Sequence, residues 1–346
     1  MISSTVLQSI ADIWQLSSKQ IKIQQNADTL TITLPFPLFN QEAEYQSQVQ
    51  SILQQHQITA QNIRFDSQIQ THQVKAGIKT LSGVKNVIAI ASGKGGVGKS
   101  TVTAMLAMAL AQSGAKVGVL DADLYGPSQG IMFGIENTQP KERNQQFIPI
   151  EKYSIQLMSM DFLVPKGQAL VWRGPLISRG LQQLFSQTAW QDIDYLLVDM
   201  PPGTGDIQLT ITQIMPLTAA VIVTTPQDIA LADAQKAIDM FQKTQIPVLG
   251  LLENMAIYQC PCCGHQEAIF GDHGGQSMAT QYNIPLIGQF PLMKSIREIT
   301  DQGQLQDLPD NIAHLYQQAA QKITQALAKL GKDYSRVFPQ MVVEKK

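Results

Sequence analysis

The chain has 346 residues, a length typical of two domains, and 44% of them are hydrophobic, which is enough for a sizeable core. Twenty-five basic residues oppose 27 acidic ones, so the formal charge is −2 and charged residues make up only 15% of the chain. Without a basic excess to neutralise phosphates, this composition argues against nucleic acid as a partner.

No stretch of the sequence predicts a membrane span or a secretion signal. The longest apolar runs, such as Val87–Ala91 and Leu217–Val223, fall far short of the roughly 20 residues that a transmembrane helix needs. The first 20 residues have neither a basic start nor a continuous apolar run. We therefore expect a cytoplasmic protein that does not bind membranes.

Residues 1–80 form a segment of distinct composition that contains sixteen glutamines. Helical apolar spacing over Ser3–Ser18 is followed by alternation over Ile21–Phe36, with a turn at Asn26–Asp28. A second helical pattern at Glu42–Gln57 precedes another alternating run at Asn62–Ile69. The order αββαβ predicts a small α+β domain, which we interpret as a docking or packing module without chemistry of its own.

Residues 81–335 alternate short apolar runs with helical stretches, and residues 336–346 form a tail. The runs are apolar at nearly every position, which indicates strands buried on both faces of a mostly parallel sheet. The class is therefore α/β, a doubly wound sheet preceded by the small α+β domain. We expect strands at Val87–Ala91, Lys116–Leu120, Tyr195–Val198, Ala219–Val223, Val248–Leu252 and Leu286–Gln289, and helices at Lys99–Ser113, Leu176–Ser186, Asp228–Lys243 and Gly275–Gln281.

A glycine-rich motif follows the first of these strands and opens a helix. It has the pattern G-x-x-x-x-G-K-[ST] in the strand–loop–helix context that a P-loop requires. Its backbone N–H groups can surround an anion, while its second lysine reaches the β- and γ-phosphates of ATP and its serine hydroxyl binds Mg²⁺. The nucleotide-binding candidates are Gly93, Lys94, Gly95, Gly96, Val97, Gly98, Lys99, Ser100 and Thr101.

Carboxylates stand at the ends of two further strands. Asp121 and Asp123 end the second strand, where a carboxylate can orient an attacking water or a water bound to Mg²⁺. We assign the attacking water to Asp123 and the outer metal shell to Asp121. Asp199 ends a strongly apolar strand, which is the Walker B arrangement for Mg²⁺.

All three cysteines lie in one short turn, Cys260-Pro261-Cys262-Cys263-Gly264. The pattern C-P-x-C-G directs two thiolates the same way, which is half of a four-thiolate site. A two-fold dimer presents the turn twice, so Cys260 and Cys263 of each subunit could bind a bridging [4Fe–4S] cluster. Zinc is an alternative, because Cys262, His265 or His273 could complete a site within one chain.

The loop Gly-Lys-Gly-Gly-Val-Gly-Lys-Ser resembles the deviant Walker loop of the family that includes MinD, ParA, the nitrogenase iron protein and the Mrp/ApbC proteins. The resemblance implies that Lys94 acts in trans on a partner's nucleotide, so that ATP clamps two subunits together. The segment after Asp199 looks like the family's second switch, in which the Gly203 N–H senses the γ-phosphate. Asn254 matches the family's adenine-contacting asparagine.

The order of motifs over residues 85–330 resembles the Mrp/ApbC family of iron–sulfur cluster carriers. That resemblance implies an ATP-binding homodimer that holds a labile cluster, with the family's two cysteines at Cys260 and Cys263. Cys262 occupies a position that the motif leaves variable. Arg173 stands in a further signature of the family, Trp172-Arg173-Gly174-Pro175, without a physical account of its role. Residues 1–80 are only loosely similar to the small iron–sulfur assembly domain of many members, and they contain no cysteine.

The sequence therefore predicts a slowly hydrolysing ATPase that passes a [4Fe–4S] cluster to apo iron–sulfur proteins, with cluster scaffold proteins as further partners. Slow turnover suits a conformational switch. One alternative is a positioning ATPase of the MinD or ParA kind, which should carry a basic amphipathic helix or a basic face. Another is a zinc-bridged dimeric adaptor ATPase, which only metal analysis would separate from the carrier.

Overall fold

A computed structural model describes residues 3–26, 28–58, 62–75, 77–136, 138–163 and 174–331, of which the side chains of 174–178 are not described. The chain divides into two compact units. Unit 1 comprises Met1–Gln73 and Thr324–Lys346, and unit 2 comprises Val74–Ile323. The predicted signature residues Trp172 and Arg173 and the tail 336–346 lie outside the described residues.

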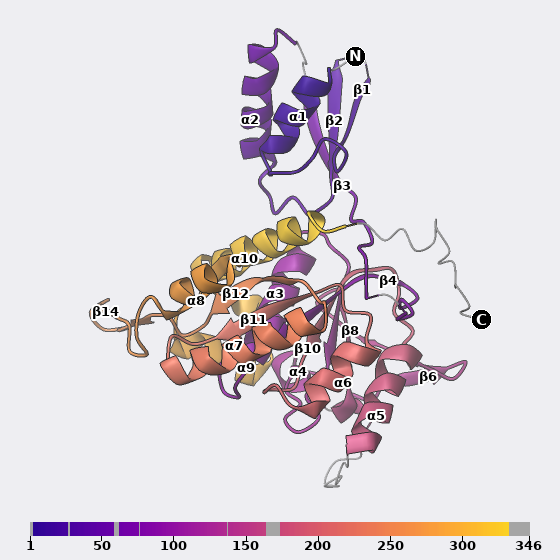
Figure 1. Ribbon diagram of the computed structural model, residues 1–346, viewed down its shortest axis with the longest axis vertical. Helices are drawn as coiled ribbons and strands as arrows, with labels where there is room; N and C mark the ends of the chain where they lie inside the picture. Colours follow the sequence, from indigo (N-terminus) through magenta and orange to yellow (C-terminus); the bar gives the residue numbers. More distant parts are fainter. Residues whose placement is uncertain are drawn as a thin grey trace, which may run out of the picture. The chain divides into compact units, whose positions relative to one another are not determined.

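Unit 1 has the predicted order αββαβ (Figure 1). Its elements are α1 (Ser4–Asp12), β1 (Lys22–Asn26), β2 (Thr29–Leu34), α2 (Glu42–Gln55) and β3 (Asn62–Ser67). Strands β1 and β2 form the expected antiparallel hairpin, and β3 pairs with β2 in parallel. The first helix is shorter than its apolar spacing predicts, because the chain turns after Asp12 and Gln15 takes a positive φ of 54°.

The core of unit 1 is an aromatic cluster under its three strands. The ring of Trp14 lies edge-on to the rings of Tyr45, Phe36 and Phe65, with centroids 5.2, 6.4 and 6.4 Å away. Edge-to-face contacts of this kind stabilise a core beyond the area that they bury. The rings pack in one buried cluster with aliphatic side chains of α1, β2 and α2, and together they form the core of this glutamine-rich unit.

Unit 2 is built on an eight-stranded sheet in the order β15-β12-β11-β4-β10-β5-β9-β8. All neighbouring pairs are parallel except the edge pair β8–β9. From β4 the chain moves to β5 and β9 on one side and then returns through β10 to β11, β12 and β15 on the other. Because crossovers are right-handed, this reversal places helices on both faces, which confirms the doubly wound class.

The strands of unit 2 are close to their expected bounds where they belong to the central sheet. They are β4 (Val84–Ala91), β5 (Val117–Asp121), β6 (Lys141–Arg143), β7 (Gln146–Ile148), β8 (Ile150–Lys152), β9 (Ile155–Ser159), β10 (Ile193–Asp199), β11 (Ala219–Thr224), β12 (Val248–Glu253), β13 (Tyr258–Gln259), β14 (Gln266–Glu267) and β15 (Leu286–Gln289).

The helices of unit 2 include the four that the sequence predicts and several that it does not. They are α3 (Lys99–Gln112), α4 (Gln129–Met132), α5 (Gly174–Gln187), α6 (Asp206–Ile214), α7 (Asp228–Lys243), α8 (Gly274–Tyr282), α9 (Lys294–Gln302) and α10 (Asp310–Ala328), with 3-10 turns at Met160–Phe162 and Leu305–Asp307. The division between the units falls within α10.

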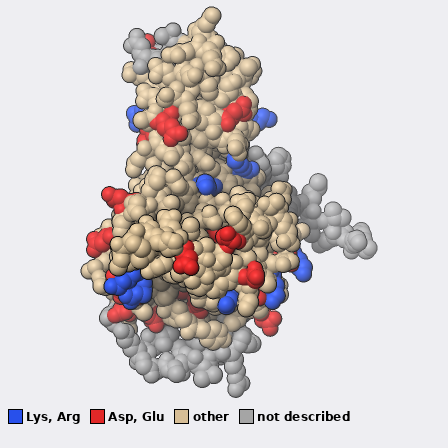
Figure 2. All heavy atoms as spheres, turned by 90° about the vertical axis from the view of Figure 1, so that its left-hand side faces the viewer, with Lys and Arg blue, Asp and Glu red and all other residues tan. Residues whose placement is uncertain are grey.

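Charged side chains are sparse over the surface, in keeping with the composition. On the face shown in Figure 2, basic and acidic side chains are interspersed and leave wide areas without charge. Among the helices that the structure describes, none combines the length and the apolar character needed to cross a bilayer.

Candidate functional site

The glycine-rich loop lies between the carboxyl end of β4 and the first turn of α3, as the sequence predicts. Its glycines are required by close contacts as well as by conformation. A Cβ on Gly93 would lie 1.9 Å from the Asp233 carbonyl oxygen, and one on Gly98 would lie 2.2 Å from Asn254 Nδ2. Gly98 also has a φ of +79°, which side-chain-bearing residues rarely adopt. The loop is thus held in a single curved path beside α7 and β12.

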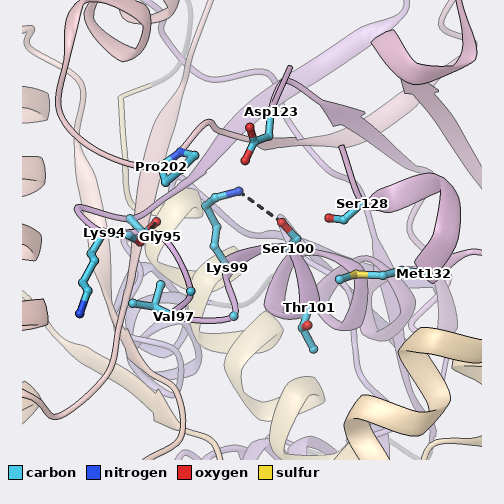
Figure 3. A pocket seen from close by; sticks show the side chains of 13 residues that line it. Lys94, Gly95, Val97, Lys99, Ser100, Thr101, Asp123, Ser128, Met132 and Pro202 are labelled. Carbon is cyan, nitrogen blue, oxygen red and sulfur yellow. Dashed lines mark hydrogen bonds between the residues drawn. The ribbon is translucent and has the colours of Figure 1, made fainter. Parts of the chain in front are cut away.

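A cavity of about 220 Å³ opens over this loop (Figure 3). The loop contributes most of its lining, and the segments after β5 and β10 contribute the rest. Backbone N–H groups at the amino end of α3, a helix of 14 residues, lie at the cavity floor, where the helix dipole favours an anion. The lining residues are Ser92, Lys94, Gly95, Gly96, Val97, Gly98, Lys99, Ser100, Thr101, Asp123, Ser128, Met132 and Pro202.

Lys99 is the buried cation of the cavity. Its ammonium group forms an ion pair with Asp199, whose side chain is fully buried at the end of β10. Lys99 Nζ also lies 3.4 Å from Ser100 Oγ, the contact drawn in Figure 3. The predicted phosphate-binding lysine and the predicted Walker B aspartate are therefore brought together directly.

The two carboxylates Asp121 and Asp199 lie opposite each other in the register of β5 and β10. Asp121 is buried, and its oxygens accept backbone N–H hydrogen bonds from Asp123, Ser128 and Gln129 at 3.0–3.1 Å. Burial, followed by the charge of Asp199, raises the pKa of Asp121 to about 7. Asp121 therefore shapes the loop that follows β5 and is absent from the cavity lining.

This raised pKa predicts a pH dependence of folding. An unfolded aspartate releases its proton near pH 4, whereas folded Asp121 keeps it to about pH 7, so the folded state binds more protons between these values. Stability should therefore fall as pH rises from about 4 to 7, by on the order of 3 kcal/mol. Asp121→Asn, which cannot ionise, should remove that part of the slope in urea unfolding measured at several pH values. An unchanged slope would contradict the assignment.

Asp123 does line the cavity, as the prediction of a water-orienting carboxylate requires. Its Oδ1 accepts hydrogen bonds from the N–H groups of Tyr125 and Gly126, both 3.3 Å long. The Asp123 carboxylate thus stands on a turn of the exposed loop after β5, facing the cavity that Lys99 enters from the opposite side (Figure 3).

Lys94 is exposed and its side chain extends away from Lys99 and Ser100 (Figure 3). Within the part of the chain that the structure describes, its ammonium group has no ion-pair or hydrogen-bond partner. Lys94 belongs to the loop but does not direct its charge into the loop's own cavity. This geometry is what a lysine acting on a second subunit requires.

Two residues expected to contact nucleotide make contacts to the protein itself. The Gly203 N–H donates to the Ser92 carbonyl oxygen at 3.1 Å, so sensing of a γ-phosphate would require this bond to break. Asn254 Nδ2 donates to the Val97 carbonyl oxygen at 2.9 Å, and the side chain is buried against the loop. Asn254 therefore holds the loop in place.

The cysteine turn joins the two strands of the β13–β14 hairpin, which projects from unit 2 in Figure 1. The turn is closed by backbone hydrogen bonds from Cys260 N to His265 O, 2.8 Å, and from Gly264 N to Cys260 O, 2.9 Å. Hydrogen bonds from the N–H groups of Cys263 and then Cys262 lower the pKa of the Cys260 thiol. Backbone N–H groups thus face the sulfur, as a turn that binds metal through thiolates requires.

A zinc site within one chain is not preassembled in this structure. His273 is exposed and lies 3.6 Å from Asp272, its neighbour in the chain. No group of three or more His, Cys, Asp or Glu side chains within the described ranges is placed to hold a metal ion. The turn offers thiolates that point outward, with Cys262 and Cys263 exposed and Cys260 half-buried.

The P-loop and the cysteine turn follow parallel strands at one edge of the sheet. Each of the large apolar side chains that are exposed in the described residues lies in a segment that follows the carboxyl end of a parallel strand at that edge, β5, β10, β11 or β12. These side chains are Tyr125, Ile131, Leu209, Ile229, Ile257 and Ile269.

Sequence reasoning gave no site role to three residues that complete the cavity. They are Ser128, directly before α4, Met132, the last residue of α4, and Pro202, in the segment after β10 that resembles the family's second switch. Gln129 is also missed, although its side chain contacts Asp199. Only the position of these residues just after strand ends could have pointed to them.

A glycine-rich loop between β4 and α3, with a buried lysine paired to the aspartate that ends β10, defines a P-loop nucleotide-binding α/β protein. The chain belongs to the ParA family, whose model, described as NUBPL iron-transfer P-loop NTPase, matches residues 83–328. The family resemblance predicted from the motifs is thereby confirmed.

Curated relatives agree with this membership. An iron–sulfur cluster carrier protein of Pseudomonas fragi is 53% identical over 268 residues, covering 76% of this chain and 93% of its own length. One from Haemophilus influenzae is 44% identical over 313 residues, covering 88% and 85%. Among solved structures, a nucleotide-binding protein of Archaeoglobus fulgidus in complex with ADP is 39% identical, with a TM-score of 0.59 over 66% of this chain and 90% of that one.

Proposed function

We propose that this chain is an ATP-dependent carrier that holds a [4Fe–4S] cluster between two subunits and transfers it to apo iron–sulfur proteins. The observation that carries the proposal is that the P-loop follows β4 and the paired thiols follow β12, two parallel strands of one sheet that are separated by β11 alone, at the same edge. Relatives at 53% and 44% identity bear the name of such carriers. Nucleotide state and cluster binding can then act on one surface.

The cavity over the P-loop fits a nucleotide with Mg²⁺. A curved backbone that a Cβ at Gly93 or Gly98 would disrupt, the amino end of α3 and the buried Lys99 are the donors that a polyphosphate requires. The relative from Archaeoglobus fulgidus binds ADP on the same fold. In our proposal Lys99 binds the β- and γ-phosphates, Ser100 and Asp199 hold Mg²⁺, and Asp123 orients the attacking water. Asn254 holds the P-loop in place through its bond to Val97.

The second subunit covers the carboxyl edge of the sheet in this proposal. Segments that follow the strands at that edge carry exposed apolar side chains, of which Ile229 and Tyr125 are 69% and 68% exposed. Burying them supplies the hydrophobic contribution to dimer stability. Lys94, which points away from its own cavity, then reaches the nucleotide of the other subunit. Hydrolysis is slow because Asp123 and Lys94 act together only in the assembled dimer.

The cluster is the cargo of this protein, and the cysteine turn supplies half of its ligands. Cys260 and Cys263 lie on a turn whose N–H groups face sulfur, and neither is enclosed by the chain that bears it. Four thiolates, two from each subunit, satisfy a [4Fe–4S] cluster. Exposure at a subunit interface suits release to a recipient, since no part of the chain has to unfold.

Metal and sulfide quantitation on anaerobically purified protein, joined to its solution mass, tests the proposal. We expect about four iron and four sulfide per dimer after reconstitution with iron and sulfide. One zinc per dimer without sulfide would instead support a zinc-bridged adaptor ATPase. Monomers without metal, in the presence of ATP and Mg²⁺, would contradict the proposed carrier.

A further inference from the structure

Gln129 is a buried polar residue that no motif of the chain explains. It begins α4, and its side chain is 1% exposed. The Nε2 group donates to Asp199 Oδ2 at 2.9 Å and to the Ser100 carbonyl oxygen at 3.0 Å. It thus joins the loop after β5 to the aspartate that ends β10 and to the P-loop.

Among the residues that the structure describes, none is a hydrogen-bond partner of the buried Gln129 Oε1 atom. The orientation of the amide is fixed by its surroundings, because both atoms near Nε2 are acceptors and require a donor. A buried acceptor without a donor costs free energy, so such an atom points to a ligand or water that completes it. Since Oε1 and Nε2 share one carbon, this free acceptor lies beside Asp199 and Ser100.

Asp199 depends on neighbouring donors because it is fully buried. Its Oδ1 is held by the Lys99 ammonium group, with Thr103 Oγ1 at 3.4 Å, and its Oδ2 is held by Gln129. Lys99 is also the lysine assigned to phosphate. When the ammonium group turns toward phosphate, Gln129 stays as the donor to Oδ2 at 2.9 Å, while Oδ1 keeps only the longer contact to Thr103 among the described residues.

The geometry points to Gln129 as a positioning residue of the magnesium site, an inference that rests on the proposed nucleotide function. Its Nε2 group fixes Asp199 Oδ2, so that Oδ1 faces the cavity when Lys99 leaves it. Its Oε1 atom, the buried acceptor without a partner among the described residues, would accept a hydrogen bond from a water bound to Mg²⁺. Gln129 thereby ties the occupancy of the metal site to the loop after β5, which carries Asp123 and the exposed Tyr125.

Binding of a fluorescent N-methylanthraniloyl ATP to the full chain, with EDTA and then over a Mg²⁺ titration, tests this role. Gln129→Met keeps the length of the side chain and removes its hydrogen bonds. We expect its affinity in EDTA to stay within about two-fold of the parent, while the Mg²⁺ concentration for half-maximal tightening rises about ten-fold. A residue with only a structural role would change the affinity in EDTA and the Mg²⁺ midpoint by the same factor.

Gln208→Met is the matched control, because Gln208 is equally buried and also has a free Oε1 but donates to the carbonyl oxygens of Pro201 and Ser92. It should leave the Mg²⁺ midpoint unchanged, whatever it does to affinity in EDTA. Gln129→Leu serves if Gln129→Met does not melt cooperatively. It also removes the Nε2 donor to Asp199, so it should raise the Mg²⁺ midpoint in the same way.

The inference is overturned if Gln129→Met leaves the Mg²⁺ midpoint where the parent has it, or shifts it no more than Gln208→Met does. It is equally overturned if Gln129→Leu leaves the Mg²⁺ midpoint unchanged. A parent chain that binds no nucleotide under either condition contradicts the proposed nucleotide site itself. The two failures are thus told apart by the parent titration.

Discussion

Replacing Lys99 with methionine is expected to abolish nucleotide binding, with a loss of affinity of at least about 100-fold. The ammonium group is the buried cation of the cavity, and a polyphosphate without it would face the carboxylate of Asp199. The same change leaves Asp199 as a buried charge without its cation, which costs about 3–5 kcal/mol of stability. Calorimetric titration with ATP and Mg²⁺, together with thermal unfolding, measures both effects.

The double variant Lys99→Met with Asp199→Asn separates the two effects. It removes both charges of the buried pair, so most of the lost stability should return while nucleotide binding stays absent. Recovery of binding together with stability would show that Lys99→Met acts through folding alone and would contradict a direct role of Lys99 toward phosphate.

Lys94→Ala should behave differently, because the side chain is exposed and points out of its own cavity (Figure 3). We expect a change in stability below about 0.5 kcal/mol and nearly unchanged nucleotide binding, but loss of hydrolysis.

Mixing the Lys94→Ala variant with Lys99→Met tests action in trans. A mixed dimer has one site with Lys99 intact and Lys94 supplied by the other subunit, so about a quarter of the parent activity should return. If ATP hydrolysis does not recover in mixtures that are shown to contain mixed dimers, Lys94 acts on the nucleotide of its own subunit.

The central sheet and the P-loop are predictable from the sequence because their signals are local. Strands buried on both faces appear as continuous apolar runs, and Asp228–Lys243 is predicted to the residue because a turn closes each end. Helices α6 and α9 are missed because each has only nine residues. Helix α6 begins directly after the segment that resembles the family's second switch, and α9 begins soon after the short strand β15. Helix α10 is missed although its apolar face is regular, because its 19 residues follow no strand that would mark it as a crossover.

Contacts between distant segments could not be predicted. The pairing of Asp121 with Asp199 depends on the register of β5 and β10, which lie 78 residues apart at this pair. The bond from Asn254 to Val97 and the contact of Gln129 with Asp199 likewise depend on strand order. Sequence therefore identifies the residues of the site, while the tertiary fold decides which of them face nucleotide and which hold other residues in place.

The cysteine variants provide the second large effect. Cys260→Ala and Cys263→Ala should each abolish binding of the reconstituted cluster, because each removes two of the four thiolates in a symmetric dimer. Cys262→Ala should retain iron and sulfide, since the cysteine motif that the chain resembles leaves the position of Cys262 variable. Visible absorption of the thiolate–iron bands and iron quantitation after anaerobic reconstitution measure the outcome.

Nucleotide titration of the same variants separates loss of cargo from loss of fold. The turn is closed by backbone bonds and projects on the β13–β14 hairpin, so none of the three alanine changes should alter ATP affinity by more than about two-fold. A Cys262→Ala protein without cluster would make Cys262 a ligand and replace the symmetric two-plus-two arrangement. A cluster retained in all three variants would place its ligands elsewhere in the chain. The proposed binding of the cluster between two cysteine turns would then be contradicted.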